Sequence, residues 1–202
     1  MEQKTPHRLY FEGILQVREP TDQVIDFIYN QIEKQKKEWI KITKISYVRN
    51  GIDFNLTSKK YLRTLGKKLQ ANFGGTVKEA PQLFSRDHQT GKDIYRLNVS
   101  FRPSSFKKND IIERKTRVYK ILSFAKEITA EDLETRKKTT IKFKEPIKLI
   151  EPIYKTIASK IKPQIEVLDP DTFQSVPTKN TATIKHGEKV KVVKYKGNFW
   201  LV

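Results

Sequence analysis

The sequence contains no cysteine among its 202 residues. Disulfides, thiolate-ligated zinc sites and a cysteine nucleophile are therefore excluded, and nothing in the chain requires an oxidising compartment. Long hydrophobic runs are also missing, because no apolar stretch exceeds five residues and a membrane span needs about 20. Residues 1–20 lack the apolar core of a signal peptide. These absences predict a soluble cytoplasmic protein that makes no contact with a membrane interior.

Acidic residues are scarce relative to basic ones. The chain holds 41 Lys and Arg against 23 Asp and Glu, which gives a formal net charge of +18. The excess is spread over both halves, with 19 − 11 = +8 for residues 1–103 and 22 − 12 = +10 for residues 104–202. Such a potential attracts polyanions, so RNA, DNA or an anionic membrane surface leads the list of partners. The 37 % of hydrophobic residues suffices for folded cores.

The first half of the chain alternates strand and helix patterns. Asn50-Gly51 separates two runs rich in strand formers, and this dipeptide is a strong hairpin signal. Apolar residues recur at helical spacing over 58–70, where Thr57 or Ser58 serves as the cap. The predicted elements are a strand at 8–18, a helix after Pro20, two strands around Asn50-Gly51, a helix at 58–70, and a hairpin of 76–87 with 92–102.

The predicted fold class is α+β. The order β-α-β-β-α-β with an added strand predicts a ferredoxin-like α/β sandwich over residues 7–103. Short β-rich runs broken by turns follow the linker-like residues 103–105, and they predict small β-barrels of SH3 or OB type. The predicted domains are therefore the ferredoxin-like domain (7–103), a small β-barrel (104–145), and a second small β-barrel (146–202) that is linked by a short helix within 146–162.

Two turns in the second half resemble each other. The segments 132–141 and 168–176 share an Asp-x-acid-Thr core. Asp132 and Asp169 are placed to accept hydrogen bonds from backbone groups two residues further on, as in Asx turns. The similarity suggests an internal repeat of two short barrel units.

The sequence offers little for catalysis. His7, His88 and His186 have no second ligand at metal-binding spacing, and no Gly-rich phosphate loop or Gly-x-Ser-x-Gly motif is present. Gly74-Gly75 is explained as a helix C-cap. We therefore expect no catalytic residues, no metal and no cofactor, and the protein is not expected to be an enzyme.

Basic side chains form the candidate binding surfaces. The helix at 58–70 carries five cations and no acid, and further cations fall in predicted turns. Cations on rigid elements suit phosphate contacts, although a Lys-rich face also serves solubility alone. Tyr61, Phe84, Tyr95 and Phe101 fit core positions better than base stacking, and Trp39 and Trp200 are expected to be packed. The candidate RNA-binding residues are Lys59, Lys60, Arg63, Lys67, Lys68, Arg86, Lys92, Lys107, Lys108, Arg136, Lys137 and Lys138.

Four blocks of the sequence, in order and spacing, resemble the Nmd-three family. They are RLYFEGILQVRE (8–19), NGIDFNLTSKKYLRTLGKKLQ (50–70), QLFSRDHQTGKDIYRLNVSFRP (82–103) and KKNDIIERKTRVYKI (107–121). In eukaryotes this family is the adaptor that rides on the large ribosomal subunit and recruits the nuclear export machinery, and archaea have shorter relatives. The last 40 residues are consistent with the family's small β-barrels, which resemble translation factor five-A.

The resemblance implies a non-enzymatic protein on the intersubunit face of the large subunit, around the exit and peptidyl tRNA sites. Its implied partners are ribosomal RNA and the exit-side stalk protein, with anti-association factor six as a further contact. RNA-facing status is carried over to the surfaces at Lys59 to Lys68 and Arg86 to Lys92.

Two family features are missing. The paired Cys-x-x-Cys zinc motifs and the eukaryotic acidic tail do not occur, so we expect a zinc-less archaeal member in the cytoplasm. The function predicted is maturation or quality control of the large subunit. A general module for structured RNA and a protein-interaction adaptor with a solubilising basic surface remain alternatives.

Overall fold

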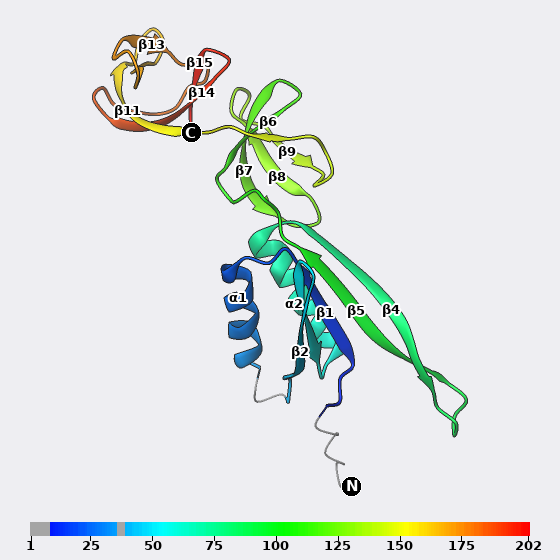
Figure 1. Cartoon of the computed structure of the whole chain (residues 1–202). Coiled ribbons are helices and arrows are strands. Elements are labelled where there is room, and N and C mark those ends of the chain that lie inside the picture. Colours follow the sequence, from blue (N-terminus) through cyan, green and yellow to red (C-terminus); the bar gives the residue numbers. More distant parts are fainter. Residues whose placement is uncertain (1–8, 36–38) are drawn as a thin grey trace. The chain divides into compact units, whose positions relative to one another are not determined.

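The computed structural model describes residues 9–35 and 39–202 and divides the chain into two compact units. The first unit runs to Ser105 and includes Phe124–Lys126, and the second contains Phe106–Ser123 and Glu127–Val202 (Figure 1). Each unit has its own sheets and core. His7 and Arg8, the first residue of the strand predicted at 8–18, lie outside the described residues. Residues 9–12 are described but are not part of the strand, which begins at Gly13.

Unit 1 contains two helices and five strands among its described residues. Their order is β-α-β-β-α-β-β, as the hydrophobic patterns predict. The bounds are β1 (Gly13–Arg18), α1 (Asp22–Glu33), β2 (Ile42–Val48), β3 (Gly51–Leu56), α2 (Lys59–Phe73), β4 (Thr76–Arg86) and β5 (Asp93–Arg102).

The sheet of unit 1 has the strand order β2-β3-β1-β5-β4. Strand β1 pairs antiparallel with β3 and parallel with β5, and β4 pairs antiparallel with β5 at the edge. The ferredoxin-like prediction is not confirmed. The added strand is β5, and it lies between β1 and β4 in the interior of the sheet instead of at its edge. Side-chain burial explains this order: β5 alternates the buried residues Leu97, Val99 and Phe101, whereas β4 is mostly exposed.

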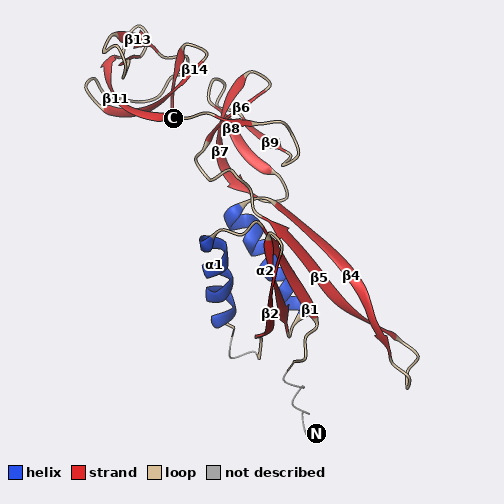
Figure 2. Ribbon diagram, in the orientation of Figure 1, coloured by secondary structure: helices blue, strands red, loops and turns tan. Residues whose placement is uncertain are grey.

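Both helices cover one face of this sheet (Figure 2). Strand alternation sends Leu15 and Val17 of β1 toward the helices, and Leu62 and Leu69 of α2 are fully buried against the sheet. Residues at the intervening strand positions lie on the opposite, helix-free face, which we call the open face.

Local signals in unit 1 meet mixed outcomes. Ser58 caps α2 by accepting a hydrogen bond from the Tyr61 amide at 3.2 Å, and Gly74 ends the helix at φ +66°, as predicted. The prediction that Trp39 is packed is wrong, because its side chain is 79 % exposed. Trp200, which belongs to unit 2, is buried as expected. In the hairpin turn, Asn50 adopts a positive φ directly before β3 begins at Gly51.

Unit 2 contains two five-stranded sheets, and no closed barrel is found in its described residues. Their strand orders are β10-β6-β7-β8-β9 and β13-β12-β11-β14-β15. The predicted SH3-like or OB-like barrels are therefore not confirmed, although the predicted β-rich runs do form strands. The bounds are β6 (Ile111–Arg114), β7 (Arg117–Phe124), β8 (Ile128–Asp132), β9 (Lys138–Ile141), β10 (Lys148–Leu149), β11 (Ile153–Lys160), β12 (Glu166–Leu168), β13 (Ser175–Pro177), β14 (Lys189–Tyr195) and β15 (Asn198–Leu201).

The helix predicted within 146–162 is wrong. This segment forms β10 and β11, with Ile153 and Ile157 exposed while Thr156 and Ala158 point inward. The isoleucines recur every four residues and imitate a helix face. Alternation over the β-branched run and the preceding Pro152 instead favour a strand.

The two similar turns are confirmed as Asx turns. Oδ1 of Asp132 accepts hydrogen bonds from the amides of Glu134 at 2.9 Å and Thr135 at 3.1 Å, and Oδ1 of Asp169 accepts one from Asp171 at 2.8 Å. Each turn follows the corresponding strand, β8 or β12. Both carboxylates are buried, so the amide contacts satisfy them.

Each of these carboxylates also faces a cation. Asp132 lies 3.2 Å from Nη1 of Arg117, and Asp169 lies 3.4 Å from Nζ of Lys194. Burial opposes the ionisation of Asp132, but the amide hydrogen bonds and Arg117 outweigh it, and its pKa falls below the usual 3.8. The Asp171 amide, and then Lys194, similarly lower the pKa of Asp169.

These depressed pKa values predict a loss of stability in acid. Because the unfolded chain binds protons at higher pH than the folded chain, both carboxylates contribute fully at neutral pH, and the contribution disappears as pH falls from about 4. Hydrogen exchange of unit 2, measured at neutral pH and at about pH 3, should show weaker protection of β8 and β12 in acid. An Asp132→Asn variant should already have weaker protection of β8 at neutral pH, and acid should weaken that protection less than in the wild type. If acid weakened the protection of β8 equally in the wild type and in the variant, this account would be contradicted.

Candidate nucleic-acid interface

Helix α2 presents its cations on the face opposite the core. The periodicity that buries Leu62, Leu65 and Leu69 places Lys59, Lys60, Arg63 and Lys67 outside. Lys68 is half-buried at the margin of the helix. The predicted solvent-facing flank is therefore present in unit 1.

The flank is partly compensated, which the local sequence does not reveal. Nε of Arg63 lies 3.1 Å from Oε2 of Glu79 on β4, and Lys68 donates to Oε1 of Gln31 on α1 at 2.8 Å. The side chains of Lys59, Lys60 and Lys67 form no ion pair with a described residue. We call these three residues the α2 lysines. They keep their charge available for a polyanion.

The tip of the β4-β5 hairpin is an ordered turn. Asp87 accepts hydrogen bonds from the Thr90 hydroxyl at 2.8 Å and the Gln89 amide at 2.8 Å. These contacts lower the pKa of Asp87, and the hydrogen bond from the Thr90 hydroxyl has the largest effect. Arg86 donates from Nε to the carbonyl of Gly91 at 3.0 Å, and its side chain remains 71 % exposed. Lys92 is exposed in the same turn, so the structure brings both predicted tip cations together.

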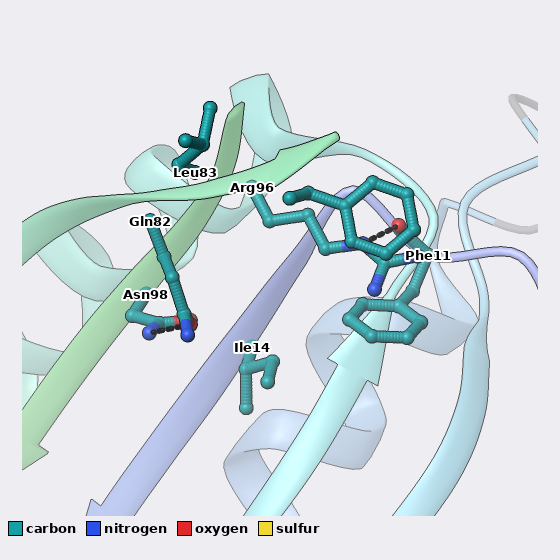
Figure 3. A pocket seen from close by; sticks show the side chains of 7 residues that line it. Phe11, Ile14, Gln82, Leu83, Arg96 and Asn98 are labelled. Atoms are coloured by element: carbon teal, nitrogen blue, oxygen red, sulfur yellow. Dashed lines mark hydrogen bonds between the residues drawn. The ribbon is translucent and has the colours of Figure 1, made fainter. Parts of the chain in front are cut away.

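The open face carries a site that the sequence analysis missed. The Arg96 guanidinium lies between two rings, 3.7 Å from the centroid of Phe11 and 3.2 Å from that of Phe84. Its Nε donates to the carbonyl of Phe11 at 3.2 Å. Burial lowers the pKa of Arg96 from its ordinary value. A small pocket opens beside this stack (Figure 3).

A strand irregularity produces the stack. The register of β4 against β5 shifts between Leu83 and Ser85, so Phe84 is an additional residue without a direct partner and leans over Arg96. The available signal was the alternation of β5, which sends Arg96 away from the core. Phe84 and Tyr95 are about half exposed instead of packed, whereas Tyr61 and Phe101 are buried as predicted.

The remaining candidate cations belong to unit 2. Lys107 and Lys108 are exposed, as are Arg136 and Lys137 in the Asx turn after β8 and Lys138 at the start of β9. Arg136 donates to the carbonyl of Thr181 at 2.8 Å. The structure therefore groups seven candidates in unit 1 and five in unit 2, and their role in RNA binding stays a prediction.

Metal and membrane features were sought in the same residues. Within residues 9–35 and 39–202, no three His, Asp or Glu side chains gather as a metal site. No helix in that part of the chain is both long and apolar enough to cross a membrane.

Comparison with known families gives one match. Residues 10–102 match the sequence profile described as NMD3, second domain, and this range corresponds to unit 1. No curated protein matches the chain. A function connected with the ribosome follows from the family in general terms. Residues 10–102 therefore belong to the second domain of the NMD3 family, the Nmd-three family that the sequence blocks resemble.

Proposed function

We propose that the protein is a non-enzymatic factor that binds ribosomal RNA of the large subunit, near the tRNA sites, during subunit maturation or quality control. The observation that carries this proposal is the cationic flank of α2 within the matched NMD3 domain. Its lysines lie on a helix anchored by a buried leucine stripe, so they are held in a fixed array. Rigid arrays of cations bind phosphate backbones without reading sequence.

The proposed mechanism uses shape and charge. A factor seated over the tRNA sites would keep an immature subunit out of translation until the factor is released. This proposal includes a fold of unit 1 related to the ferredoxin-like sandwich and small barrels in unit 2 related to translation factor five-A. It also includes contacts with the exit-side stalk protein and anti-association factor six. An adaptor role and an archaeal, cytoplasmic setting belong to it as well.

Cosedimentation with separated ribosomal subunits tests the proposal. The purified protein should comigrate with large subunits at low salt and remain at the top of the gradient with small subunits. Because counterion release drives phosphate binding, the large-subunit complex should weaken steeply as salt rises. Equal comigration with both subunits would favour a general structured-RNA module, which the sequence-independent character of a lysine flank also suits. Absence of comigration with either would contradict the proposal.

A further inference from the structure

The pocket on the open face joins a stacked cation to two amide side chains (Figure 3). Its volume is about 130 Å³. Arg96 and Phe11 lie on one side, and Ile14 lies between them and the amides of Gln82 and Asn98. Phe84 lines the same pocket, with its ring beside Arg96. The lining residues are Phe11, Ile14, Gln82, Leu83, Phe84, Arg96 and Asn98.

The amides are held in place by each other. Nδ2 of Asn98 donates to Oε1 of Gln82 at 3.0 Å. Gln82 is exposed, and its own amino group donates to no described residue. Asn98 therefore orients the Gln82 amide and leaves the Gln82 amino group without a partner among the described residues.

The chemistry of this lining selects among ligands. Pockets that enclose a metabolite hold roughly 300–1,000 Å³, which is larger than this hollow. A ring with apolar faces and a hydrogen-bonding edge fits better, because it can stack on one wall and meet an amide at its edge. Unstacked RNA bases have this character, and proteins bind them by stacking on aromatic rings and Arg planes.

We propose that this pocket binds one unstacked base of single-stranded RNA. The 52 % exposed ring of Phe84, which Arg96 supports from one side, supplies the stacking surface. The Gln82 amide hydrogen-bonds to the edge of the base, as side-chain amides do when they recognise bases. This inference rests on the proposed RNA-binding function and adds a single-stranded contact to the phosphate contacts of α2.

Fluorescence of a short single-stranded RNA with one 2-aminopurine tests the inference. Stacking should quench the probe when wild-type protein binds. Phe84→Ala should abolish the quenching and weaken binding by roughly 5- to 150-fold, the range that loss of one stacked base produces. Phe84→Tyr keeps a ring and should behave as wild type, and Gln82→Ala should weaken binding while quenching persists.

The matched control is Phe173→Ala. Phe173 is a 77 % exposed aromatic residue in unit 2, so its loss should change neither signal. Wild-type quenching and affinity in Phe84→Ala would overturn the inference. Comigration of the protein with large subunits, combined with no binding of the single-stranded probe, would overturn this inference alone. Failure to bind both would overturn the proposed function as well.

Discussion

Reversing the charge of the α2 lysines should weaken binding to the large subunit by at least about 100-fold. The variant combines Lys59→Glu, Lys60→Glu and Lys67→Glu, whose side chains are exposed and form no ion pair with a described residue. Hydrogen bonds to charged groups contribute on the order of 1.5–3 kcal/mol each, and reversal adds repulsion from phosphates. Because each lost phosphate contact also reduces counterion release, the slope of log affinity against log salt should become shallower by about three.

The fold of this variant should survive. The acids at positions 59 and 60 fall in the first turn of α2, where they interact favourably with the helix dipole. None of the three lysines belongs to the core. A matched control, Lys142→Glu with Lys144→Glu and Lys162→Glu, changes net charge equally at exposed positions of unit 2. The control should retain most of its affinity at a given salt concentration. Equal losses in both variants would show that net charge, not the α2 surface, governs binding.

Replacing Gly13 with alanine should destabilise unit 1 by about 3 kcal/mol. A Cβ at this position would collide with the backbone carbonyl oxygen of Leu97 and lie 2.6 Å from Cδ2 of Leu62. The carbonyl belongs to β5, which pairs with β1, and Leu62 is fully buried in α2. Neither neighbour has room to move, so the cost should reach the upper part of the usual 1–3 kcal/mol for overpacking.

Hydrogen exchange followed by peptide would localise this effect. Protection of β1, β5 and α2 should fall in Gly13→Ala, and protection of β11 and β14 in unit 2 should not change. Gly91→Ala is the control, because a Cβ there meets nothing within 4 Å and only the positive φ of +65° opposes it. Unchanged protection of β1 in Gly13→Ala would contradict the tight contact between helix and sheet.

Signals confined to a few residues predicted unit 1 well. The Ser58 cap, the leucine spacing of α2 and the glycine that ends the helix all act within one turn of chain, so the helix formed where the pattern placed it. The position of β5 depends on which arm of a hairpin has the more apolar face. That choice is made by competition between strands for the centre of the sheet, which no local pattern expresses.

The candidate site shows the same division. Exposure of the α2 lysines follows from helical periodicity, whereas the Arg63–Glu79 pair joins residues of different elements and required the structure. The stack of Arg96 between Phe11 and Phe84 depends on strand pairing across 85 positions of sequence and on a bulge in β4. In unit 2, isoleucines that recur every four residues predicted a helix. The same segment forms strand β11, in which more exposed and more buried side chains alternate.

Site-directed crosslinking tests the central claim most directly. Because the chain has no cysteine, Lys67→Cys provides a single attachment point for a photoactivated crosslinker on the exposed face of α2. Lys162→Cys provides a control at a position that is also exposed, in unit 2. After irradiation with large subunits, the probe at position 67 should form an adduct with ribosomal RNA far more efficiently than the probe at position 162. An adduct with protein alone, or equal RNA adducts from both positions, would contradict the claim that α2 is the surface that binds ribosomal RNA.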